Sequence, residues 1–220
     1  MTLALFDLDN TLIGGDSDYL WGRFLVKRGI VDGPAYDARN DHFYQQYVAG
    51  TLDVHEYLRF ALQPLTEHSP DQLAQWREEF VREWIQPLVL PRGIQLVRDH
   101  ADRGDTTLII TATNRFITAP IADLFRVDAL LATTPERREG AYTGEVTGPV
   151  TFGSGKVDAL RAWLGEHGGS LQGSHFYSDS HNDLPLLEQV DHPVAVDPDA
   201  TLRAAARERG WRCISLRDTP

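Results

Sequence analysis

The sequence predicts an α/β protein, in which a doubly wound parallel sheet is interrupted after its first strand by a helical module. Short apolar, β-branched segments alternate with helical patterns from residue 92 onward. That alternation is typical of parallel β-α-β units. A further strand-like segment opens the chain at residues 3–7, whereas residues 16 to about 86 show helical patterns alone. The first strand is therefore expected to be separated from the others by a block of helices.

Composition sets the limits of this interpretation. The 220 residues suffice for one large domain, or for one domain and a smaller module. A single cysteine, Cys213, excludes an internal disulfide and a multi-cysteine zinc site. The net charge of −11 repels phosphate backbones, so no nucleic-acid partner is expected. No apolar run reaches the ~18 residues of a membrane helix and no signal-peptide pattern opens the chain, which favours a cytoplasmic protein without a membrane partner.

Four helices are expected in the helical block. They are predicted from about residue 16 to Gly29, at 35–49, at 53–62 and from Pro70 to about residue 86. The last follows a capping box, Ser69-Pro70-Asp71-Gln72, with proline in the first helical position. The tryptophans of the block recur at helical spacing, which favours packing inside the module over a binding stack.

The second part of the chain supplies the rest of the sheet. Strands are expected at 106–111, 129–133, 174–178, 193–197 and within 211–216, with helices at 92–103, 115–125, 155–167, 183–189 and 200–210. The turn-rich stretch 134–153 is expected to hold a small hairpin. This order is the one a doubly wound sheet requires.

Polar side chains follow several of the predicted strands. The set consists of Asp7, Asp9, Thr111, Asp179 and Asp183, and it is joined by Lys156 at the start of a helix. Because ligands bind outside the carboxyl ends of parallel strands, these groups are expected to converge at one edge of the sheet. Four crowded carboxylates need a counter-charge, and hard oxygen ligands without histidine or cysteine suit Mg²⁺.

Such a set fits phosphoryl chemistry. A carboxylate beside a metal can attack phosphorus and form an aspartyl-phosphate. A second carboxylate two residues further on can protonate the leaving oxygen and then activate water. Lys156 is one of only two lysines, and a cation in a first helical turn opposes the helix dipole by roughly 0.3–1 kcal/mol, so its position indicates a bound anion or a carboxylate neighbour.

The order of these segments resembles a known family. FDLDNT, LIIT, a lysine that opens a helix, and SDSHND are similar to the four motifs of the haloacid dehalogenase-like (HAD) hydrolases. The helical block and FDLDNTL most resemble the phosphoserine-phosphatase-like branch, which includes histidinol-phosphate phosphatases. The resemblance implies a Rossmann-like catalytic core of residues 1–14 and 88–220 under a helical-bundle cap of residues 15–87.

The resemblance also implies roles for individual residues. Asp7 would be the nucleophile and a Mg²⁺ ligand, and Asp9 would be the general acid and base, with its backbone carbonyl as a second metal ligand. Asp179 would also ligate Mg²⁺, with Asn182 and Asp183 as supports of the metal. The phosphate-binding residues would be Thr111, Ala112 and Lys156. Asp183 also fits the N-cap of the helix that follows it, and the two roles are compatible. No role is assigned to His181.

The cap suggests a substrate. Asp16 matches an acidic residue that faces the substrate amine in the phosphoserine branch, although the N-cap of the first cap helix is an equal alternative. The arginine that grips the serine carboxylate in that branch falls at Ala61, and Arg59 would replace it only about half a turn out of register. The resemblance therefore favours a small phosphorylated metabolite with an amine and no carboxylate, such as L-histidinol phosphate, with phosphoserine as the alternative.

A non-catalytic class of protein uses a similar set of residues. Signalling receiver domains also gather acidic residues, a threonine and a lysine around a phospho-aspartate. They are about half as long as this chain and have no insertion after the first strand, which argues against a phospho-aspartate signalling or binding module. The sequence assigns no oligomeric state.

Overall fold

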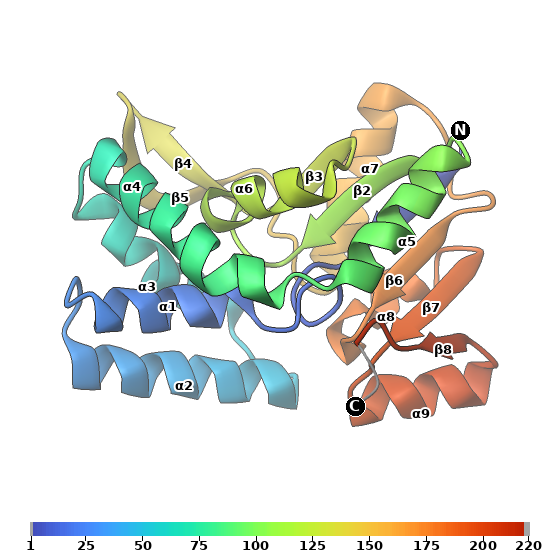
Figure 1. Ribbon diagram of the computed structural model, residues 1–220, viewed down its shortest axis with the longest axis horizontal. Coiled ribbons are helices and arrows are strands. Elements are labelled where there is room, and N and C mark those ends of the chain that lie inside the picture. Colours follow the sequence, from blue (N-terminus) through green and yellow to red (C-terminus); the bar gives the residue numbers. More distant parts are fainter. Residues whose placement is uncertain (1, 218–220) are drawn as a thin grey trace.

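The computed structural model describes residues 2–217 and contains a six-stranded parallel sheet (Figure 1). The strand order is β3-β2-β1-β6-β7-β8. The strands are β1 (Leu3–Phe6), β2 (Thr106–Thr111), β3 (Ala129–Ala132), β6 (His175–Ser178), β7 (His192–Val196) and β8 (Arg212–Ile214). The sequence prediction of a doubly wound α/β core is confirmed.

Helices cover both faces of this sheet. They are α5 (Pro91–Asp102), α6 (Arg115–Phe125), α7 (Ser154–His167), α8 (Leu184–Leu187) and α9 (Ala200–Arg209). Alternate residues of β1 point to opposite faces: Ala4 and Phe6 pack in the core with α5 and α6, while Leu3 and Leu5 pack with α7, α8 and α9. Burial on both faces explains the continuous apolar segments of the central strands.

The insertion between β1 and α5 is helical. It consists of α1 (Ser17–Lys27), α2 (Gly33–Ala49), α3 (Val54–Thr66) and α4 (Pro70–Phe80), followed by a π-helical turn at Val81–Ile85 and a 3-10 turn at Gln86–Leu88. The capping box at Ser69 and Gln72 is formed. Trp21 is buried against Phe24 and Phe80, so it packs inside the module as expected.

Two helices are longer than the sequence patterns suggested. Helix α2 begins at Gly33 with proline in its first turn, and α3 continues to Thr66 through Pro64. Proline usually ends a helix. Here Leu62 and Leu65 are buried on either side of Pro64, and this packing holds the last turn in place.

The chain leaves and re-enters the core at one point. Ile13 and Val89 form an antiparallel bridge, the Gly14 amide donates to the Leu88 carbonyl at 2.7 Å, and the Leu90 amide donates to the Leu12 carbonyl at 3.1 Å. The two crossings between core and cap are thus hydrogen-bonded to each other. This pairing coincides with the predicted limits of the two domains, at residues 14/15 and 87/88, which stay a prediction.

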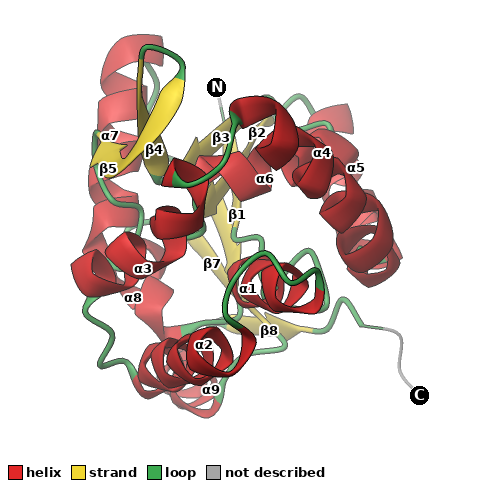
Figure 2. Cartoon of the chain, turned by 90° about the vertical axis from the view of Figure 1, so that its left-hand side faces the viewer, coloured by secondary structure: helices red, strands yellow, loops and turns green. Residues whose placement is uncertain are grey.

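A hairpin reaches from the core toward the cap. Strands β4 (Thr134–Arg138) and β5 (Ala141–Thr147) pair antiparallel, as expected for the turn-rich stretch, and β5 lies against α3 (Figure 2). A Cβ on Gly144 would lie 3.2 Å from Cγ2 of Thr66, so the two elements are in close contact. Within residues 2–217, no helix combines the length and the apolar character needed to cross a membrane.

Candidate active site

Asp7 follows β1 and lies in a buried ionic cluster. Nζ of Lys156, in the first turn of α7, is 2.7 Å from Oδ1 of Asp7 and 2.7 Å from Oδ2 of Asp183. Ser178 Oγ also donates to Oδ2 of Asp183 at 2.7 Å. Burial alone would lower the pKa of Lys156, but the charges of Asp183 and Asp7 outweigh it and raise that pKa above its usual value. Lys156 is therefore a firmly charged bridge between two acids.

A hydroxyl joins Asp7 to a third carboxylate. Thr11 Oγ1 lies 3.3 Å from Oδ2 of Asp7 and 3.0 Å from Oδ1 of Asp179, and it accepts a hydrogen bond from the Asp179 amide at 3.1 Å. Burial is the main cause that raises the pKa of Asp179 well above its usual value, and the charges of Asp7 and Asp183 add to it. Burial raises the pKa of Asp7 as well, because Lys156 compensates only part of the crowding.

The cluster suits a divalent cation. Lys156 is the one cation among the described residues that line the pocket, and it faces several buried carboxylates. Such an excess of negative charge is relieved by a bound Mg²⁺, which prefers oxygen ligands. Within residues 2–217, no three acidic, histidine or cysteine side chains are gathered as a ligand set. The expected ligands include only two carboxylates, Asp7 and Asp179, and their donor chemistry fits.

Asp9 has a separate hydrogen-bond shell. Its Oδ1 accepts from the Ser17 amide at 2.6 Å, and its Oδ2 accepts from Thr113 Oγ1 at 2.8 Å. Thr111 Oγ1 lies at the limit of hydrogen bonding, 3.5 Å from Oδ2. Burial, with the Asp16 charge, raises the pKa of Asp9 to about 6 despite these donors. A carboxyl with this pKa holds and releases a proton near neutral pH.

The end of β2 forms a polar turn beside Asp9. Thr111 Oγ1 accepts a hydrogen bond from the Thr113 amide at 3.2 Å, and the Thr111 carbonyl accepts one from Thr151 Oγ1 at 2.6 Å. Asn114 caps α6 by accepting from the Ile117 amide at 3.3 Å. Thr111 and Ala112 both line the pocket. The predicted phosphate-binding residues thus lie at the site, with their turn held in place on both sides.

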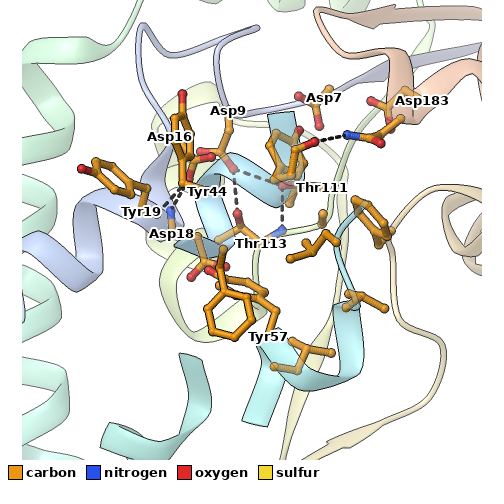
Figure 3. A pocket seen from close by; sticks show the side chains of 18 of the residues that line it. Asp7, Asp9, Asp16, Asp18, Tyr19, Tyr44, Tyr57, Thr111, Thr113 and Asp183 are labelled. Carbon is orange, nitrogen blue, oxygen red and sulfur yellow. Dashed lines mark hydrogen bonds between the residues drawn. The ribbon is translucent and has the colours of Figure 1, made fainter. Parts of the chain in front are cut away.

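The ionic cluster opens into a pocket between core and cap (Figure 3). The pocket encloses about 730 Å³ of empty space, including its open mouth. Its cap side carries two further carboxylates, Asp16 and Asp18, and an aromatic wall from α1, α2 and α3. The wall comprises Tyr19, Phe43, Tyr44, Tyr47 and Tyr57. The pocket therefore pairs a phosphate-binding end with an acidic, aromatic end.

The structure shows which of two residues, Asp16 and Asp183, caps the helix that follows it. Asp16 is the N-cap of α1, since its Oδ1 accepts from the amides of Asp18 and Tyr19 at 3.0 and 2.9 Å, and it lines the pocket as well. Burial raises its pKa to about 6. Asp183 precedes α8 without a capping hydrogen bond, because its carboxylate is engaged with Lys156 and Ser178.

Arg59 is not brought to the site. Its side chain is exposed on α3, whereas Tyr57 and Leu58 line the pocket. The guanidinium therefore does not contribute to the pocket lining. Ala61 is buried and is also absent from the lining. Arg59 as a substrate ligand stays an untested prediction that this geometry does not favour.

The loop after β6 touches the cap. Asn182 lines the pocket, and its Nδ2 lies 3.4 Å from the Tyr47 carbonyl at the end of α2. His181 is held by Asp199, whose Oδ2 is 2.8 Å from Nδ1 of the ring and 2.7 Å from the His181 amide. On the other side, Nε2 of His181 lies 2.8 Å from the position of a Cβ on Gly50. His181 therefore forms part of the core–cap contact.

Several site residues escaped sequence reasoning. Thr11 stands inside the first motif, so its spacing was a usable signal for contact with Asp7. Thr113, Asp18 and the tyrosines of the wall carry no such signal, because their place depends on how α1, α2 and α3 pack over the sheet. Four of the seven tyrosines of the chain fall within residues 36–57, and three of these four belong to the wall, which is a weak compositional hint.

The fold and the site together define a hydrolase of the HAD type. Residues 4–188 match the family model of the haloacid dehalogenase-like hydrolases. The chain belongs to this family, and within it the chain is a phosphatase of the phosphoserine-phosphatase-like branch.

Two relatives illustrate the similarity in sequence. A histidinol-phosphatase of Neisseria meningitidis serogroup C (strain 8013) is 44% identical over 219 residues, which cover 98% of this chain and 99% of the relative. A phosphoserine phosphatase of Mycobacterium tuberculosis (strain ATCC 25618 / H37Rv) is 34% identical over 217 residues, with 97% and 70% covered.

Solved structures show the same fold. A protein of unknown function from Bordetella pertussis Tohama I superposes with a TM-score of 0.93 at 45% identity, covering 99% of this chain and 100% of that one. A substrate-bound phosphoserine phosphatase superposes with a TM-score of 0.72 at 17% identity, covering 97% and 92%. At that identity, the second likeness concerns the fold alone.

Proposed function

We propose that this phosphatase hydrolyses L-histidinol phosphate in a Mg²⁺-dependent reaction, as a step of amino-acid biosynthesis. The observation that carries the proposal is the charge of the pocket. Five of its lining residues are acidic, Asp7, Asp9, Asp16, Asp18 and Asp183, and Lys156 is the one cation among the described lining residues. A substrate carboxylate would meet no cation at the cap end, whereas an amine would meet Asp16.

Asp7 is the proposed nucleophile. One of its oxygens attacks phosphorus, the P–O bond to the substrate alcohol breaks, and an aspartyl-phosphate forms. Lys156 holds the Asp7 carboxylate in position through its 2.7 Å contact and offsets the charge of the phosphoryl oxygens. Thr111 and the turn at Ala112 bind those oxygens.

Asp9 is the proposed general acid and base. In its protonated form it delivers a proton to the leaving alcohol oxygen; as a carboxylate it then takes a proton from the water that attacks the aspartyl-phosphate. Its pKa of about 6 suits both roles near neutral pH. The Ser17 amide and the Thr113 hydroxyl keep this carboxyl oriented throughout.

Mg²⁺ would be held by Asp7, Asp179 and the Asp9 carbonyl, with Asn182 and Asp183 in support. When bound, it supplies positive charge that offsets the negative charge of the phosphate and of the surrounding carboxylates. The raised pKa values of Asp7 and Asp179 support this assignment, since both groups lack sufficient counter-charge.

Two relatives point to different substrates, and the pocket favours one of them. The relative named histidinol-phosphatase is the more similar of the two, at 44% against 34% identity. A phosphoserine phosphatase would need a cation for the serine carboxylate, and Arg59 lies outside the pocket lining. Phosphoserine is therefore the less favoured substrate.

The test is phosphate release from a panel of monoesters, with and without Mg²⁺. The panel contains L-histidinol phosphate, L-phosphoserine, O-phosphoethanolamine and a sugar phosphate, with Asp7→Asn as the inactive control. We expect kcat/KM to be highest for L-histidinol phosphate and activity to be lost in EDTA. A preference for L-phosphoserine would contradict the substrate, and full activity in EDTA would contradict the role of the metal.

A further inference from the structure

Beyond Asp16, the pocket extends to a second carboxylate with no assigned role. Asp18 lies two residues further along the first turn of α1 and lines the same pocket. Figure 3 shows Asp18 and Tyr57 on the side of the pocket away from Asp7 and Asp183. Asp18 therefore faces the part of a substrate that is remote from phosphorus.

Asp18 has no structural task that would explain its place. Asp16 already caps α1, and only the backbone amide of Asp18 takes part in that cap. An acid in a first helical turn is favoured by the helix dipole, but an exposed side chain would satisfy the dipole equally well. The carboxylate is instead turned into the pocket, where burial raises its pKa to about 7. This placement lowers the stability of the folded state, and no strong contact of the carboxylate compensates for it.

The surroundings of Asp18 are polar on one side and aromatic on the other. Asn114 Nδ2 lies 3.5 Å from Oδ1, a weak contact. Tyr57 lines the same pocket, and its hydroxyl lowers the pKa of the Asp18 carboxyl in part. Phe43 and Leu58 add apolar surface to the same lining. A flat ring with an N–H donor at its edge matches these surroundings, because carboxylates are strong acceptors and aromatic walls favour rings.

We propose that Asp18, with the Tyr57 hydroxyl beside it, is a specificity-determining residue that accepts a hydrogen bond from a ring N–H at the end of the substrate remote from the phosphate. The inference rests on the proposed function, since L-histidinol phosphate carries an imidazole at that end. Asp16 takes the amine, which is nearer to phosphorus, and Asp18 takes the ring. The distance between Asp16 and Asp18 would thus favour substrates in which the amine and the ring have a matching separation.

Two substrates that differ in the ring test this role. L-phenylalaninol phosphate keeps the phosphate, the amine and a ring of similar size, but its ring has no N–H. We expect wild-type kcat/KM to favour L-histidinol phosphate over L-phenylalaninol phosphate by at least tenfold. This ratio should fall at least tenfold in Asp18→Ala and to a smaller extent in Asp18→Asn and Tyr57→Phe, because a hydrogen bond to a charged group is lost or weakened.

Glu56→Gln is the matched control. Glu56 is an exposed acid on α3, next to Tyr57 in the sequence and outside the pocket lining, so its loss should leave the ratio as in the wild type. A ratio unchanged in the Asp18 variants would overturn the inference, even if the wild type hydrolyses L-histidinol phosphate well. A wild type that hydrolyses O-phosphoethanolamine but not L-histidinol phosphate would refute the proposed substrate, and this inference with it.

Inhibition by product provides a second measurement that does not depend on turnover of either test substrate. L-histidinol and L-phenylalaninol would be compared as inhibitors of p-nitrophenyl phosphate hydrolysis. We expect L-histidinol to inhibit the wild type more strongly, and the two inhibitors to become similar in Asp18→Asn. Equal inhibition of the wild type by both compounds would count against Asp18 as the ring acceptor.

Discussion

Nζ of Lys156 lies 2.7 Å from Oδ1 of Asp7, and the same ammonium lies 2.7 Å from Asp183. One cation thus serves two buried carboxylates. Lys156→Met should cost about 3–5 kcal/mol of unfolding free energy, because both acids lose their partner. Urea unfolding of Lys156→Met, of Asp183→Asn and of the double variant Lys156→Met/Asp183→Asn measures this. The double variant should lose less than the sum of the single losses, and strict additivity would contradict the coupling.

Asp7 and Asp9, the two carboxylates of the first motif, should have different effects on the kinetics. Asp9→Asn should lower kcat by roughly 10²–10⁴-fold for an alkyl phosphate, because the leaving alcohol needs a proton. The rate at which p-nitrophenyl phosphate forms the phospho-enzyme should fall less, because nitrophenolate leaves without being protonated. Burst kinetics of nitrophenolate release would reveal accumulated phospho-enzyme. If the rate of phospho-enzyme formation falls equally for the alkyl phosphate and for p-nitrophenyl phosphate, Asp9 is not the acid.

Asp18 should reduce stability at alkaline pH. Its folded-state pKa of about 7 lies above its ordinary value of 3.8, so the folded state disfavours the charged form. Asp18→Asn should therefore raise the unfolding free energy by an amount on the order of 1 kcal/mol at pH 8. The gain should shrink as the pH falls from about 7 toward 4, because in this interval Asp18 is neutral in the folded state but still charged in the unfolded state. Thermal unfolding at pH 8 and pH 5 tests this trend.

In contrast to Asp18, His100 should reduce stability at acidic pH. Its ring nitrogens lie 2.7 Å from Asp105 and 2.8 Å from the Tyr177 hydroxyl, and burial lowers its pKa despite the neighbouring acid. A histidine whose pKa is depressed on folding binds more protons when unfolded, so it reduces stability as the pH falls below about 6.5. His100→Asn should flatten this part of the pH–stability curve in urea titrations. An unchanged slope would contradict the assignment.

Two glycines form a matched pair at the cap. Gly50 and Gly29 have φ angles of +69° and +65°, but only at Gly50 would a Cβ meet a neighbour, Nε2 of His181 at 2.8 Å. Both alanine variants should lose roughly 1 kcal/mol through backbone strain. Gly50→Ala should also raise KM, because it separates the cap from the loop after β6. A KM that is equal in both variants would contradict this contact.

The sheet could be predicted because its signals are local. Continuous apolar segments, such as residues 106–111, identify strands buried on both faces, and a strand end places Asp7 or Asp179 at the edge of the sheet without knowledge of the rest. The roles of these residues came from the resemblance to a family.

The lining of the cap could not be predicted in the same way. It depends on how helices cross, and Arg59 shows the sensitivity: two residues along α3, Tyr57 lines the pocket while Arg59 faces solvent. Asp18 illustrates the same limit. Its neighbours Tyr57 and Asn114 come from segments distant in sequence, and no spacing in the chain announces them.

The bridge between Ile13 and Val89 holds the two ends of the cap next to each other. Because its entry and exit are paired side by side, the helices between them can be exchanged for others without lengthening or displacing any strand of the sheet, just as insertions elsewhere succeed where chain ends lie close together. The residues proposed to break the phosphate ester and the cap residues proposed to select its alcohol thus lie on opposite sides of these two crossings. Changes in the cap sequence can therefore alter substrate specificity while the residues of the core that carry out hydrolysis stay unchanged.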